Sequence, residues 1–153
     1  MAHKLTELEV LCFKDKSEVD KSIKFPTIFN LFPFCKFLDI ATAYNGWVRD
    51  LVDANLTTKI NMISIEHDDL NELLGFDADD IQRLHEQHDE IYLSLTYKVH
   101  GPTHESKEYF EKRIRETFGL PKSFSNDIYF EVRFVNHPEN SDLIYWCSVD
   151  DMS

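Results

Sequence analysis

Residues 91–99, IYLSLTYKV, constrain the fold most strongly because apolar and polar side chains alternate there with a period of two. One face would carry Ile91, Leu93, Leu95, Tyr97 and Val99, and the other Tyr92, Ser94, Thr96 and Lys98. A period of two is typical of a β-strand that buries one face and leaves the other more polar. We therefore expect the chain to be built around a β-sheet.

The remaining elements are predicted from their own patterns. Strands are expected at 6–13, 59–66, 127–135 and 143–149, helices at 39–55, 77–90 and 103–121, and a short helical turn at 67–76. The longest of these helices is well signalled, because Thr103 can cap it while Gly119 and Pro121 end it. In the predicted helix 39–55, Asp39 is the expected N-cap.

A phenylalanine-rich segment, residues 25–37, contains Pro26 and Pro33 and five of the twelve phenylalanines of the chain. Because proline disrupts helices and central strands, we expect this segment to be irregular or edge-like. Two interpretations remain open: a hydrophobic flap over the core, or an aromatic contact patch.

Taken in order, the elements predict a single α+β domain spanning residues 1–153. The expected order is β-α-β-α-β-α-β-β, with a largely antiparallel sheet and helices packed on one of its faces. A length of 153 residues and a hydrophobic content of 42% are those of one globular domain. No internal repeat is visible in the sequence.

Negative charge is concentrated in one short piece of the chain. Between Glu66 and Glu90 there are ten acidic residues and a single base, Arg83, whereas the whole chain has a net charge of −12. Helix capping and the helix dipole explain one or two carboxylates for each helix, with Asp77 as the expected cap of the second helix. The excess over that number predicts a contact surface for a basic partner. The candidate partner-binding residues are Asp68, Asp69, Glu72, Asp77, Asp79, Asp80, Glu86 and Asp89.

Other patterns exclude several function classes. An acidic chain is repelled by nucleic acid and by anionic membranes, so neither is an expected direct partner. The sequence has no glycine-rich phosphate loop and no nucleophile motif, and we expect no catalytic residues, no cofactor and no metal. Cys12, Cys35 and Cys147 form no CxxC pair, which fits a reducing compartment. Without an apolar leader near residue 1, the expected location is the cytoplasm.

Histidines provide the alternative hypothesis. His85, His88, His100 and His104 have spacings that zinc ligands also have, so a small metal-dependent enzyme is the second candidate. The expected strand between the two pairs would hold them about 30 Å apart, unless the chain folds back.

Residues 34–56, FCKFLDIATAYNGWVRDLVDANL, resemble a stretch of contact-dependent growth-inhibition immunity proteins, which belong to polymorphic toxin systems. The positions that carry this resemblance are Asp39, Ile40, Asn45, Trp47 and Leu51. It implies a small cytoplasmic α+β protein that binds and blocks a toxin domain, and it places these residues in a helix core rather than on the contact surface.

The leading hypothesis is a non-enzymatic acidic inhibitor that occludes a basic, nucleic-acid-handling site on another protein. The partner would be a toxin nuclease or a nucleic-acid-processing defence enzyme. The chain would then be an immunity protein or a phage anti-defence inhibitor, including the kind that mimics nucleic acid. Carboxylates compete well for the Lys and Arg residues that line such a site.

Overall fold

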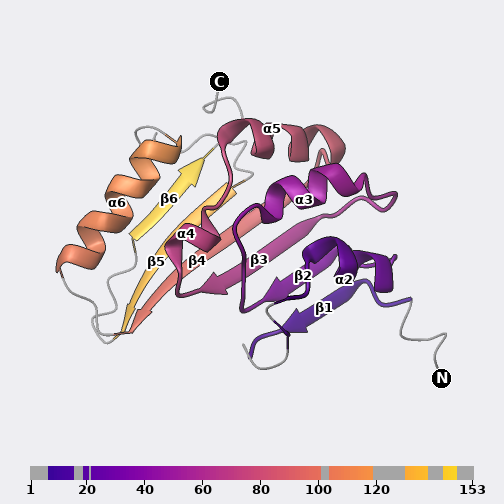
Figure 1. Ribbon diagram of the computed structural model, residues 1–153, viewed down its shortest axis with the longest axis horizontal. Coiled ribbons are helices and arrows are strands. Elements are labelled where there is room, and N and C mark those ends of the chain that lie inside the picture. The colour runs from indigo at the N-terminus through magenta and orange to yellow at the C-terminus, as the bar shows by residue number, and fades with distance from the viewer. Residues whose placement is uncertain are drawn as a thin grey trace.

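Six strands form one sheet in which every strand lies beside its neighbour in the sequence, in the order β1-β2-β3-β4-β5-β6 (Figure 1). The computed structural model describes residues 7–15, 19–20, 22–100, 104–118, 130–137 and 143–147. The strands are β1 (Val10–Phe13), β2 (Phe37–Ile40), β3 (Met62–His67), β4 (Tyr92–His100), β5 (Phe130–His137) and β6 (Leu143–Cys147). The helices are α2 (Phe25–Leu31), α3 (Trp47–Ala54), α4 (Leu70–Leu73), α5 (Ala78–Gln87) and α6 (His104–Phe118).

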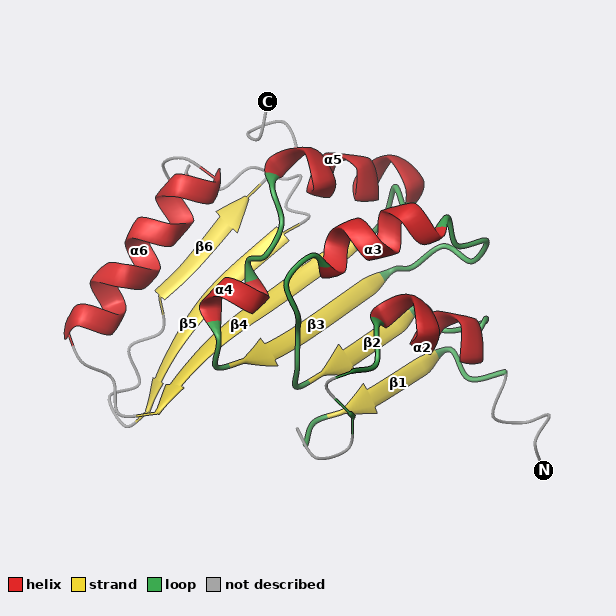
Figure 2. Cartoon of the chain, in the orientation of Figure 1, coloured by secondary structure: helices red, strands yellow, loops and turns green. Residues whose placement is uncertain are grey.

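The first five strands are all parallel, and only β6 runs antiparallel, beside β5. The prediction of a largely antiparallel α+β sheet is therefore wrong, and the fold is of the α/β kind. Each parallel pair is joined through one or two helices, which provide the long crossover that parallel strands require. Because consecutive strands are neighbours and such crossovers share one hand, the helices collect on a single face (Figure 2).

Side-chain burial alternates along the parallel strands. Toward the helices lie Leu11, Leu38, Ile40, Ile63, Ile65, Leu93, Leu95 and Val132, each no more than 6% exposed. The intervening positions, such as Ser64, Ser94 and Thr96, are only partly buried. This alternation is common in antiparallel sheets with one solvated face. It therefore led to the wrong prediction of a largely antiparallel sheet. Here it arises in a parallel sheet whose helices all lie on the same side.

Two segments differ locally from the prediction. Residues 25–31 form helix α2 although they contain Pro26, because proline is tolerated in the first helical turn. The predicted helix 39–55 divides into the end of β2 and the shorter α3, with Gly46 as N-cap at φ 88°. Asp39 therefore lies within a strand and does not cap a helix.

The core is packed between the helices and the covered face of the sheet. Trp47 at the start of α3 is fully buried and donates a hydrogen bond from Nε1 to the carbonyl oxygen of Leu73, 3.1 Å away. Its ring lies 5.6 Å from that of Phe25 and 5.5 Å from that of Phe76, measured between centroids. Residues from α2, α3 and the α4–α5 connection thus meet at one side chain. The helices of the layer that carries the acidic segment are therefore held to one another there.

Candidate partner-binding surface

The first group of acidic residues surrounds the end of β3. Asp69 is the N-cap of α4, and its side chain accepts a hydrogen bond from the backbone N–H of Glu72 at 3.1 Å. His67 is only 6% exposed, with Nδ1 3.8 Å from Asp68 Oδ1 and Nε2 3.6 Å from Glu72 Oε1. Two half-exposed carboxylates therefore flank a buried imidazole, while Asp69 has a capping role as well.

The second group lies at the start of α5 and is largely structural. Asp77 caps the helix as predicted, accepting from the backbone N–H of Asp80 at 2.9 Å, and Asp80 accepts in return from the N–H of Asp77 at 3.3 Å. Reciprocal bonds of this kind satisfy two backbone donors that the helix itself leaves unpaired. Asp80 is 4% exposed and cannot meet a partner protein in this conformation, whereas Asp77 remains exposed.

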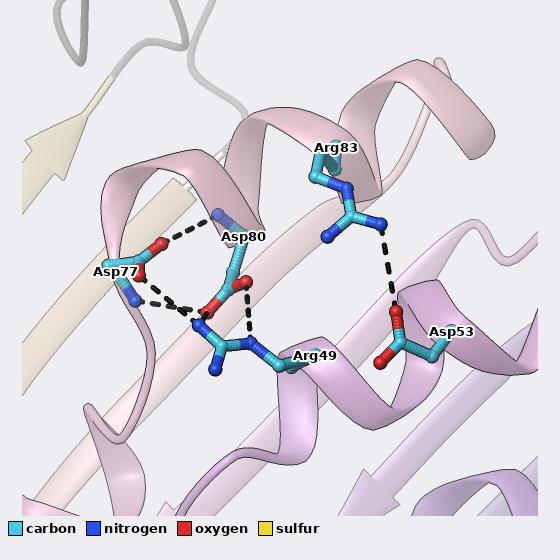
Figure 3. Close-up of polar contacts among 5 residues, drawn as sticks. All are labelled: Arg49, Asp53, Asp77, Asp80 and Arg83. Atoms are coloured by element: carbon cyan, nitrogen blue, oxygen red, sulfur yellow. Dashed lines mark hydrogen bonds and ion pairs between the residues drawn. The ribbon is translucent and has the colours of Figure 1, made fainter.

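Arginine residues neutralise part of this group (Figure 3). Arg49 of α3 places Nε 3.2 Å from Asp80 Oδ1 and Nη2 3.3 Å from Asp77 Oδ2. The hydrogen bond to Asp80 is the main reason that the pKa of Arg49 is raised, with the charges of Asp80 and Asp77 adding to the effect. Arg83 of α5 pairs with Asp53 of α3, with Nη2 3.6 Å from Oδ1. Basic side chains in this region are thus engaged within the domain.

A third group makes no such ion pair with any residue that the structure describes. Asp79, Glu86 and Asp89 are exposed along α5 and the turn that follows it. Helix α5 has ten residues and is therefore about 15 Å long, so these carboxylates form a ridge rather than a compact cluster. The predicted acidic segment extends from the C-terminal end of β3, over α5, to the approach to β4. The structure brings seven of the eight candidate residues to the surface and buries Asp80.

The histidines of the alternative hypothesis do not meet. His85 lies in α5 and His88 follows that helix, close to where β4 begins, whereas His100 ends β4 and His104 begins α6. A nine-residue strand separates its ends by about 27 Å, so the two pairs cannot share one ion. Within the part of the chain that the structure describes, no group of three or more His, Cys, Asp or Glu residues is arranged to hold a metal.

Burial determines the protonation state of His85 and His88. His85 and His88 are 7% and 1% exposed. Loss of hydration lowers the pKa of His85 to about 4, with His88 contributing, and it also lowers the pKa of His88, helped by Lys59 and opposed by Asp89. Both imidazoles are therefore neutral near pH 7 and serve as packed core residues.

The residues that carry the resemblance to immunity proteins lie around the start of α3. Trp47 and Leu51 are fully buried in that helix, while Ile40 ends β2 and Asn45 lies in the connecting turn.

None of the described helices has the length and apolar character needed to cross a membrane.

Comparison with known proteins defines no family for this chain. Neither family models nor curated proteins nor solved structures give a match. Its class is therefore described by its own geometry: a mainly parallel α/β sheet with helices on one face and an acidic helix layer.

Proposed function

We propose that this chain is a non-enzymatic protein that binds a basic surface on another protein through its acidic helix layer. The observation that carries the proposal is the ridge of exposed carboxylates along α5 and the turn after it, together with Asp68 and Glu72 beside the end of β3. Arg49 and Arg83, which lie in the same region, are engaged in ion pairs with acidic residues of the domain itself. The ridge is therefore complementary to a surface rich in lysine and arginine.

The proposed partner is a protein that handles nucleic acid, such as a toxin nuclease or a defence enzyme. Sites that hold a polyanion are lined by cationic side chains, and a row of carboxylates can occupy them in place of the phosphates. Opposite charges also speed association, an effect that salt weakens by screening. The similarity of residues 34–56 to immunity proteins supports the same kind of role, inhibition by occlusion.

The test is reversal of three exposed charges that neither cap a helix nor pair with Arg49 or Arg83. The variant Asp79→Lys, Glu86→Lys, Asp89→Lys changes residues outside the capping box and the Arg49 cluster. A matched control, Glu7→Lys, Glu111→Lys, Glu116→Lys, changes the net charge equally but near β1 and on α6, away from the ridge. The three proteins would be immobilised, used to capture partners from the source cells, and then compared in titrations against the purified partner.

We expect the ridge variant to bind at least about tenfold more weakly than the control, because several charge pairs are lost together. Affinity of the unmodified protein should fall as salt rises from about 50 to about 300 mM, where screening becomes strong. Equal binding by ridge variant and control, with both folded, would rule the proposal out.

A further inference from the structure

The second face of the sheet is uncovered by any described element. Helices α2, α3, α4 and α5 lie across the other face in Figure 1, and α6 joins them there because Phe110 stacks on Tyr97, 5.9 Å between ring centroids. Parallel sheets almost always have both faces covered, because their strands are buried on each side. An open parallel face is therefore a surface that a further protein layer can complete.

An apolar row crosses this open face. Val10, Phe37, Met62 and Tyr92 are successive register partners on β1, β2, β3 and β4. Val10 is 61% exposed and Phe37 is 37% exposed, which is high for large apolar side chains in a sheet. With strands about 4.8 Å apart, the row is about 14 Å long. The next row on this face is more polar, with Asp39, Ser64 and Ser94 as successive register partners on β2, β3 and β4.

Charges of β3, β4 and β5 on the open face are paired within it, whereas Asp39 of β2 also carries a charge there and accepts a hydrogen bond from Cys12 Sγ at 3.6 Å. Lys98 Nζ lies 3.0 Å from Glu66 Oε1, and Arg133 Nη2 lies 3.0 Å from Glu131 Oε1. The hydroxyl of Tyr92 donates to Glu131 Oε2 at 2.9 Å. This face thus has little net charge to draw either a polycation or a polyanion, in contrast to the acidic helix layer.

The distribution of charge along the chain also favours contact through the open face. Residues 1–37 contain five acidic and six basic residues, a net charge of +1, so the rest of the chain carries −13 to give the total of −12. The acidic ridge lies on the helix side, away from the open face. A second copy can therefore approach the open face without bringing the two ridges together. An approach through the helix layer would bring the ridges close to one another.

We propose that two copies of this chain pair through their open sheet faces about a two-fold axis, with one apolar row against the other. Sheets that pack in this way lie about 10 Å apart with their strands about 30° from alignment. The contact is isologous, so each row buries its partner. Both acidic ridges then point outward, and a dimer would present two copies of the partner-binding surface.

The experiment is sedimentation equilibrium over about 10 to about 500 µM, a range suited to a contact of modest area. Val10→Asp and Phe37→Asp place a charge in the row, and Val10→Lys does so with the opposite sign. Leu31→Asp is the matched control, because Leu31 is 62% exposed but belongs to α2 on the helix side. Thermal melts of all variants verify that they are folded.

The expected result is a dimer for the unmodified protein and for Leu31→Asp, with dissociation constants at least about tenfold weaker in all three row variants. Weaker dimerisation with either sign of introduced charge would identify an apolar contact rather than a change in net repulsion. A monomeric unmodified protein across the whole range would overturn the proposal. Row variants that dimerise as well as the control would overturn it too. Neither outcome bears on binding by the acidic ridge.

Discussion

The backbone N–H of Ile60 donates a hydrogen bond to Nδ1 of His88, 3.0 Å away, so a buried imidazole holds the segment leading into β3 against the end of α5. Protonation of Nδ1 would turn this acceptor into a donor and break the bond. His85, one helical turn earlier, is also buried and neutral. The acidic ridge thus lies on a helix whose attachment depends on uncharged histidines.

Stability should therefore fall in mild acid. The folded-state pKa values of His85 and His88 lie below the ordinary value of about 6.5, so between about pH 6.5 and pH 4 the unfolded chain binds more protons. The free energy of unfolding, measured in urea, should drop by about 1–3 kcal/mol from pH 7.5 to pH 5. The variant His85→Gln should reduce this difference. If the free energy of unfolding of that variant depended on pH as in the unmodified protein, the assignment of the acid sensitivity to His85 would be contradicted.

Removing the carboxylate of Asp80 should destabilise the domain through α5. Asp80→Ala removes the buried acceptor for Arg49 and for the N–H of Asp77, with an expected cost of about 1–3 kcal/mol in the free energy of unfolding. Asp77→Ala should cost about 1 kcal/mol through loss of the cap. Asp79→Ala, at the exposed neighbouring position, is the control and should change stability by no more than about 0.5 kcal/mol.

Trp47 should be the most sensitive single residue of the helix layer. Trp47→Ala removes a fully buried ring that contacts Phe25 and Phe76, with an expected cost of about 3–5 kcal/mol. Trp47→Phe keeps a ring but leaves the carbonyl of Leu73 without its donor, for a cost of about 1–2 kcal/mol. Chemical denaturation measures both. A small effect of Trp47→Ala in a folded protein would show that the layer packs differently.

Gly46 and Gly75, which lie near the cluster of Arg49, Asp77 and Asp80, should respond to alanine for different reasons. A Cβ on Gly75 would lie 2.8 Å from the Cα of Asn45, so Gly75→Ala should cost about 1–3 kcal/mol by crowding. Gly46→Ala has open space but a φ of 88°, and strain alone should cost about 1 kcal/mol. Adding Asn45→Ala should recover only part of the Gly75→Ala loss, because a backbone atom remains in the way. Full recovery in urea unfolding would contradict this account.

Local periodicity was enough to predict much of the secondary structure. The faces of residues 91–98, the helix found at 104–118 and the capping role of Asp77 follow from spacing and capping rules that act within a few residues. The helix at 25–31 was missed because Pro26 was interpreted as a helix breaker rather than as a residue of the first turn.

Strand direction and side-chain pairing could not be obtained in the same way. Parallel pairing depends on where each helix leads the chain, and the polar positions Ser94 and Thr96 resemble those of a half-exposed antiparallel strand. Burial of Asp80 depends on Arg49, which is 31 residues away in the sequence. The acidic segment was visible from composition alone, but its division into capping, paired and exposed residues requires the fold.

The sequential order of the strands affects how the chain acquires its structure. Each new strand adds beside the one synthesised just before it, so the domain can grow in one direction as it leaves the ribosome, without waiting for distant segments. Pairing of β1 with β2 and then β3 needs only the first 67 residues. The growing edge stays unpaired until the next unit arrives, and pauses in translation there would expose it to aggregation.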